Sequence, residues 1–214
     1  MKQILNLHIM ILPPVFFLCF FFLLYQQAHA GTAIAISYPE LVRTSEAIAM
    51  VFVEKKSCIQ EKGYLSTLNE VVVVKPISDN LKEGNKLTIK TRGGEMGDLR
   101  QNVPGEATFV LQENALVFLT RDSHQPCIWW SKERAQGTYH IMPKGKERVL
   151  KTGDVDLLFA LVPPSSGLSG QSNMSVIPAT QQLEGRSVAD SLFLQLQKDW
   201  HRLHKITIST SSTR

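Results

Sequence analysis

Cys58 and Cys127 are the pair of side chains with the best defined chemistry in this sequence. Neither lies in a Cys-x-x-Cys motif, and no histidine partners stand near them at the spacing of a zinc site. The third cysteine, Cys19, lies in an N-terminal segment that we expect to be removed. An even number of cysteines in an exported chain is typical of a disulfide. We therefore predict a Cys58–Cys127 disulfide, worth about 4 kcal/mol in the chain-entropy view.

The other polar residues do not form a catalytic motif. The sequence has no G-x-S-x-G nucleophile elbow. Glu106, Glu113 and Asp122 could act as a general acid and base, but nothing in the sequence selects a pair among them. His201 and His204 stand three residues apart without an identified third ligand, so we read them as solvent-side residues. We expect no catalytic residue, no metal site and no cofactor.

A glycine-rich loop and a tandem tryptophan are the candidate binding residues. The glycines of segment 92–98 lack the spacing of a nucleotide-binding loop, and we interpret them as a strand connection that needs positive φ. The two tryptophans lie in a predicted strand, so one ring faces the core and the other faces the surface. We predict a contact surface formed by Gly93, Gly94, Glu95, Trp129 and Trp130.

The first thirty residues predict export. Lys2 precedes an apolar stretch over 9–24, and Ala28-His29-Ala30 is typical of a signal peptidase site. Cleavage would fall between Ala30 and Gly31. A retained membrane anchor is the alternative, but Pro13-Pro14 interrupts the apolar stretch. We expect a periplasmic or extracellular protein without stable membrane insertion after cleavage.

The charge of the exported part argues against nucleic acid as a partner. Removal of residues 1–30 leaves 184 residues with 22 Lys and Arg against 19 Asp and Glu, a net charge of +3. No arginine-rich run or basic stripe with interleaved aromatic residues is present. The basic cluster within 144–151 is interpreted as a solvated hairpin.

Short apolar and β-branched segments at regular spacing predict a mainly β domain over 31–162. A short helix or turn is expected at 38–42. The predicted strands are 47–54, 65–75, 86–91, 108–111, 116–120, 127–131 and 137–142. We expect an OB-like antiparallel β-barrel of five or six strands with added hairpins.

After residue 162 the composition changes. Residues 163–186 are predicted to be a linker rich in Pro, Ser and Gly, followed by an amphipathic helix over 187–205 with Ser187 as its N-cap, and by a disordered tail over 206–214. The apolar stripe of the helix comprises Val188, Leu192, Leu196, Trp200 and Leu203. The stripe would dock on the barrel or serve as a partner surface.

Segment 47–119 resembles a family of exported bacterial β-barrel proteins. The shared motifs are Ser45-Glu46-Ala47, Thr67 with Val71-Val72-Val73-Val74, Leu81-Lys82-Glu83-Gly84, Gly93-Gly94-Glu95-Met96-Gly97, Val103-Pro104-Gly105 and Val117-Phe118-Leu119. The order of strands is similar to the OB-like N-terminal domain of tissue inhibitors of metalloproteinases. In that domain a mature N-terminal cysteine chelates the protease zinc. Cleavage here would expose Gly31, so this role cannot be carried over.

Together these observations favour an exported, non-catalytic binding or interaction protein whose partner is another exported protein. The alternative is a protease inhibitor-like or protease-associated factor that acts through a loop. A hydrolase with a site assembled from distant carboxylates is a third hypothesis.

Overall fold

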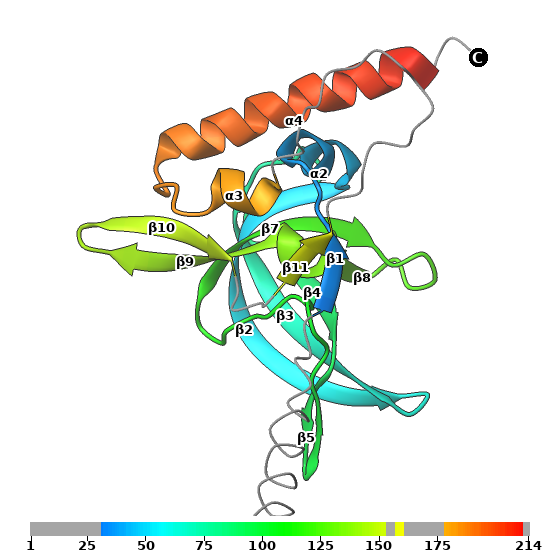
Figure 1. Cartoon of the computed structure of the whole chain (residues 1–214). Helices are drawn as coiled ribbons and strands as arrows, with labels where there is room; N and C mark the ends of the chain where they lie inside the picture. Colours follow the sequence, from blue (N-terminus) through cyan, green and yellow to red (C-terminus); the bar gives the residue numbers. More distant parts are fainter. Residues whose placement is uncertain (1–30, 153–156, 161–177, 212–214) are drawn as a thin grey trace, which may run out of the picture. The chain divides into compact units, whose positions relative to one another are not determined.

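A computed structural model describes residues 31–152, 157–160 and 178–211, and the side chains of 34–152 and 178–205 (Figure 1). The strands are β1 (Gly31–Ile34), β2 (Ala47–Glu61), β3 (Tyr64–Pro76), β4 (Lys86–Arg92), β5 (Gly94–Met96), β6 (Leu99–Gln101), β7 (Asn114–Arg121), β8 (Ile128–Ser131), β9 (Thr138–Lys144), β10 (Glu147–Thr152) and β11 (Leu157–Ala160). The helices are α2 (Tyr38–Thr44), α3 (Ala179–Leu183) and α4 (Asp190–Ser211), with a 3₁₀ turn η1 (Arg134–Gly137). The predicted signal peptide, 1–30, and the first part of the predicted linker, 163–177, lie outside the described residues.

Five strands close into a ring. The main sheet has the order β10-β9-β7-β2-β3-β4-β8, and an additional pairing of β7 with β8 joins its far strand back to β7. All neighbours in the ring are antiparallel except β4 and β8, which run parallel. Strands β9 and β10 extend the sheet outside the ring, β1 pairs in parallel with β11, and β5 pairs with β6. The prediction of a mainly β domain followed by a C-terminal helix is confirmed.

The ring holds an apolar interior because alternate residues of each strand face inward. On β2 these are Ala47, Ala49, Val51 and Val53, all at most 1 % exposed. Strands β3, β4, β7 and β8 contribute to the same cluster, and Phe109 joins it from the loop before β7. A β-bulge between Val53 and Lys55 shifts the register of β2 by one residue. Beyond the bulge, Lys56 and Cys58 therefore lie opposite the inward series of β3.

A second apolar cluster lies on the outside of the ring, under the helices. Ile48, Leu116 and Phe118 point outward from β2 and β7 and are at most 1 % exposed. They pack with residues of α2, α3 and α4, and Figure 1 shows α4 lying over α2 and α3. The predicted apolar stripe of α4 does dock: Leu192, Leu196 and Trp200 are buried, and Val188 and Leu203 pack against the cluster at its edge.

His204 differs from its predicted solvent-side position. Its ring stacks on that of Trp200 with centroids 3.6 Å apart, and its Nε2 lies 3.3 Å from the Ser45 carbonyl oxygen. His201 is exposed, as predicted, and its Nδ1 lies 3.4 Å from Asp79 Oδ2. Of the two histidines, His204 therefore packs against Trp200 and the end of α2, whereas His201 is exposed.

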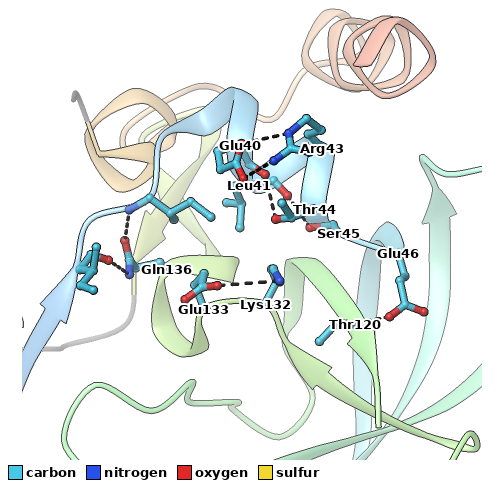
Figure 2. A network of polar contacts seen from close by, with 12 residues as sticks. Glu40, Leu41, Arg43, Thr44, Ser45, Glu46, Thr120, Lys132, Glu133 and Gln136 are labelled. Atoms are coloured by element: carbon cyan, nitrogen blue, oxygen red, sulfur yellow. Dashed lines mark hydrogen bonds and ion pairs between the residues drawn. The ribbon is translucent and has the colours of Figure 1, made fainter. Parts of the chain in front are cut away.

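Polar contacts fix both ends of α2 on the sheet (Figure 2). Before the helix, the buried amide of Gln136 accepts a hydrogen bond from Ile36 N at 3.0 Å and donates one to Ile34 O at 2.9 Å. After the helix, Glu46 Oε1 accepts a hydrogen bond from Thr120 Oγ1 at 2.7 Å. The short helix expected at 38–42 is thus present as α2 and is held at both ends.

The boundaries at the C-terminal end differ from the prediction. Within the predicted linker, residues 179–183 form α3, because Ala179 and Leu183 are fully buried in the outer cluster. Ser187 is not an N-cap; it forms a bridge with Val149, and α4 begins three residues later. The helix then continues to Ser211, into the predicted tail.

Most predicted strands are present, and the exception is 108–111. Segment 108–111 is a loop whose Phe109 turns into the ring. Strands β1, β5, β6, β10 and β11 were not predicted. Strand β10 pairs with β9, so the basic cluster within 144–151 does lie on a hairpin. Among the described residues, no helix is both long and apolar enough to cross a membrane.

Candidate binding site

The predicted Cys58–Cys127 disulfide is not formed, and both cysteines are free thiols. Cys58 is opposite Thr67 on β3, and Thr67 is opposite Thr91 on β4. Cys127 precedes β8, whose Ile128 is opposite Thr88. In this register Cys58 is level with Thr91 of β4, whereas Cys127 lies beyond Thr88, so the two cysteines are offset by at least three residues, about 10 Å, along the strands. A disulfide needs Cα atoms within about 7 Å, so the sheet keeps these two thiols apart.

The tandem tryptophans face opposite sides of β8, as their alternation predicts. Trp129 is 3 % exposed and belongs to the interior cluster of the ring. Trp130 is half-buried on the outside. The interior position of Trp129 removes it from the predicted contact surface, because a ring inside the core cannot touch a partner. Trp130 remains a candidate.

Trp130 lies in a groove on the outer face of β3, β4 and β8. The groove has a volume of 900 Å³. Its walls come from the turn between β2 and β3, from the outward side chains of β3 and β4, and from the loop between β7 and β8; they include Lys62, Tyr64, Ser66, Lys90, Arg92, Gln101 and Gln125. Every residue that lines the groove belongs to a strand or a loop. Tyr64, which also lines the groove, is 68 % exposed.

Two cations flank the indole of Trp130. Lys90 Nζ lies 5.8 Å and the Arg92 guanidinium 5.6 Å from its ring centroid. Lys90 also forms an ion pair with Glu61, so part of its charge is balanced inside the groove. Arg92 is 3.8 Å from Glu106 Oε2 and is half-exposed. The groove thus combines an aromatic ring with positive charge and a few polar side chains, which suits a ligand with apolar and anionic or polar groups.

The loop after β7 fixes the orientation of Trp130. Asp122 Oδ2 accepts a hydrogen bond from the indole N–H at 2.7 Å. Its other oxygen accepts from the backbone N–H groups of His124 and Gln125 at 2.8 and 2.9 Å. These hydrogen bonds, chiefly that from Trp130, lower the pKa of Asp122. The indole N–H is already used, so the ring would meet a ligand through its π face and edge.

The glycine loop shapes the backbone, as predicted. Gly94 has a φ of +140°, and a Cβ atom there would lie 2.8 Å from Cys58 Sγ and closer still to Thr67 Oγ1. Gly93 has a φ of +83°, and a Cβ atom there would lie 2.5 Å from Gln101 O. Both glycines are therefore required for the close approach of this loop to β2, β3 and β6. Glu95 forms an ion pair with Arg100 across the β5–β6 hairpin at 2.9 Å.

Gly93, Gly94 and Glu95 line a second, smaller hollow of 280 Å³. This hollow and the groove share Arg92, Gln101 and Val103 in their walls. The predicted contact surface is therefore divided: Trp130 lies in the groove, the glycine loop lies in the hollow, and Trp129 lies in neither. Of the three acidic residues considered as catalytic candidates, the hollow selects Glu106.

Sequence reasoning missed the residues that surround Trp130. Lys90 and Arg92 alternate with inward Ile89 and Thr91, so their shared outward face was visible in the pattern of 86–92. Their proximity to Trp130 was not, because it depends on the parallel pairing of β4 with β8. Among the described residues, no group of three or more His, Cys, Asp or Glu side chains is placed to hold a metal ion.

No family model, no curated protein and no solved structure matches this chain. The groove and the hollow are therefore the features from which a function can be inferred.

Proposed function

We propose that this protein is an exported, non-catalytic binding protein that holds a segment of another exported protein in the groove. The observation that carries the proposal is the half-buried ring of Trp130, which is flanked by Lys90 and Arg92. No residue that lines the groove around this ring belongs to a helix. Aromatic and arginine side chains often dominate the energy of protein interfaces. We propose that Trp130 is the anchor and that Tyr64 and the two cations complete the contact.

The strand order supports an OB-like barrel as the scaffold. The ring strands, in chain order, are β2, β3, β4, β7 and β8. In OB-folds, the face of the second and third strands and the loops after the first and fourth strands bind ligands. The groove lies on the corresponding elements: its walls include Ser66 of β3, Lys90 of β4, Lys62 of the β2–β3 turn and Gln125 of the β7–β8 loop.

The test compares three forms of the chain that begins at Gly31. Wild type, Trp130→Ala and the matched surface control Leu194→Ala are immobilised and exposed to the exported proteins of the source cells. Leu194 is 57 % exposed on α4, away from the groove lining. We expect a protein retained by wild type and by Leu194→Ala and lost from Trp130→Ala, with all three chains still folded at the temperature of the experiment.

Two results would favour the other hypotheses. Inhibition of a proteinase by wild type that persists in Trp130→Ala would favour a protease inhibitor-like factor acting through another loop. Turnover in a hydrolase panel that is lost in Glu106→Gln would identify an enzyme. Export itself is tested by N-terminal sequencing of the native protein, which should begin at Gly31; a chain that begins at Met1 in the membrane fraction would indicate an anchor.

A further inference from the structure

The hollow is the polar end of the ring interior. Along β3 the inward residues change from Val73 and Val71 to Asn69 and Thr67, and along β4 from Ile89 to Thr91. The β5–β6 hairpin and the loop over 103–109 form the other walls. The bulge in β2 adds Lys56 opposite Asn69. Polar side chains thus converge where the apolar core of the ring ends.

Asn69 has a hydrogen-bonding capacity that the fold does not use. Asn69 is only 1 % exposed. Its Nδ2 donates hydrogen bonds to Ile89 O at 3.0 Å and to Thr91 Oγ1 at 3.3 Å. Its Oδ1 is buried and has no hydrogen-bond donor among the described residues. A buried polar atom without a partner is costly. Tyr139 and Thr180 also have buried hydroxyl groups without a partner, but of the three residues Asn69 alone lines the hollow, where a bound molecule could supply the hydrogen bond.

Glu106 brings a buried carboxyl group to the same hollow. The residue is 8 % exposed, and its Oε1 accepts a hydrogen bond from Ala107 N at 3.2 Å. Burial raises the pKa of Glu106, while Arg92 and Arg134 act in the opposite direction. Arg92 NH1 lies 3.8 Å from its Oε2, so the hollow has no separate anionic and cationic poles. A zwitterion or a simple inorganic anion would therefore meet opposing charge on this wall.

The hydrogen-bond donors and acceptors that line the hollow suit a ligand with several hydroxyl groups. Asn69 Oδ1 and Glu106 are acceptors, Arg92 and Lys56 are donors, and the ring of Phe109 supplies an apolar surface. A hydroxyl group both donates and accepts, so several hydroxyls on one small ring can satisfy such a mixed set. The volume of 280 Å³ far exceeds that of one water molecule, about 30 Å³ in the liquid, and is just below the range of drug-sized sites.

We infer that the hollow binds a small polyhydroxylated molecule of monosaccharide size, with Asn69 Oδ1 and Glu106 accepting hydrogen bonds from its hydroxyl groups. This site is separate from the anchor ring of the groove and stands whether or not a protein partner binds there. The shared wall at Arg92, Gln101 and Val103 would let a sugar at the end of a longer chain also reach the groove.

The experiment titrates the chain from Gly31 with glucose, galactose, mannose and N-acetylglucosamine, each alone, by calorimetry and by ¹⁵N-resolved NMR. We expect at least one sugar to bind with a Kd of about 1 mM or tighter and to shift the side-chain amide signal of Asn69. Glu106→Gln should weaken binding about tenfold, because a charged acceptor is lost. The matched control Glu147→Gln, on the exposed β10, should bind as wild type does.

Asn69→Leu removes the free acceptor at nearly constant volume and should abolish binding. If this variant does not fold, the test is the side-chain amide signal of Asn69 in wild type, which should shift when the sugar is added. The inference is overturned if none of the sugars binds, if binding is lost in Trp130→Ala but kept in Glu106→Gln, or if glycine or inorganic phosphate binds the hollow in place of the sugars.

Discussion

The two outer faces of the strand ring differ in polarity and in what covers them. On the β2–β7 face, the outward residues Ile48, Leu116 and Phe118 are apolar and lie under the helices. On the β3–β4–β8 face, the outward residues include Lys90 and Arg92, and a single aromatic ring, Trp130, lies half-buried between them. The first face is completed by the chain itself, whereas the second offers an aromatic surface that the chain leaves partly open.

The same contrast divides the interior of the ring. Its middle is apolar and well packed, while its end at Asn69 and Glu106 is polar and hollow. Apolar burial explains the stability of the middle and of the helical face. It does not explain the buried acceptor of Asn69 in the hollow or the half-buried indole of Trp130, and these are the two regions in which we propose binding.

The largest effect is expected on the helical face. Trp200→Ala should lower the free energy of unfolding by about 3 to 5 kcal/mol, because a ring that is 7 % exposed leaves a cavity between α4 and the outer cluster. Urea unfolding measures the loss. The control Leu194→Ala, on the exposed side of the same helix, should change it by no more than about 0.5 kcal/mol. Equal, small effects would show that α4 is not part of the cooperative fold.

The two neighbouring tryptophans sharpen the comparison between covered and open surface. Trp129→Ala should destabilise by about 3 kcal/mol, since the ring fills the interior. Trp130→Ala should cost about 1 kcal/mol, because the half-buried ring gives up less apolar contact and one hydrogen bond to Asp122. Thermal unfolding of both variants measures the gap. If Trp130→Ala is as damaging as Trp129→Ala, the ring is structural and the groove loses its anchor.

The third prediction concerns the glycine loop at the mouth of the hollow. Gly94→Ala should destabilise by about 2 to 3 kcal/mol, because its Cβ would press on Cys58 and Thr67 at a φ of +140°. Gly97→Ala is the matched control on the hairpin turn. It also has positive φ, +59°, but nothing lies within 4 Å of its Cβ, so about 1 kcal/mol is expected. Similar losses in denaturation midpoint would mean that the close approach at Gly94 is unimportant.

Local signals in the sequence were sufficient for the five ring strands and for α4, but not for the short outer strands or for the way in which the elements pair. The stripe on α4 repeats every three or four residues, and this period predicted the burial of Leu192, Leu196 and Trp200 but missed that of Phe193. The disulfide prediction was wrong because the number of cysteines says nothing about strand register. The register places Cys58 level with Thr91 of β4, whereas Cys127 lies beyond Thr88.

Two further features depend on long-range pairing and could not be predicted. The parallel pairing of β4 with β8 joins Lys90 to Trp130, forty residues later, and so creates the groove. The bulge after Val53 turns Lys56 toward the hollow, where simple alternation would have placed Lys55. Segment 179–183 is also too short for a helical period to show, although its buried Ala179 and Leu183 make it part of the core.

The smallest effect separates the hollow from the apolar middle by its response to pH. Burial raises the pKa of Glu106 in the folded chain above its value in the unfolded chain. The folded state therefore binds the proton more tightly, and the contribution of Glu106 to stability declines as the pH rises from the ordinary glutamate value through the raised one. Glu106→Gln cannot ionise, so this decline should disappear in the variant.

Urea unfolding of both proteins from about pH 4 to about pH 7 measures the decline. The free energy of unfolding of wild type relative to that of Glu106→Gln should fall with rising pH. Glu147→Gln, exposed on β10, should run parallel to wild type. If the Glu106→Gln curve also runs parallel, Arg92 and Arg134 fully compensate the carboxylate, and the hollow would present a permanent charge to its ligand.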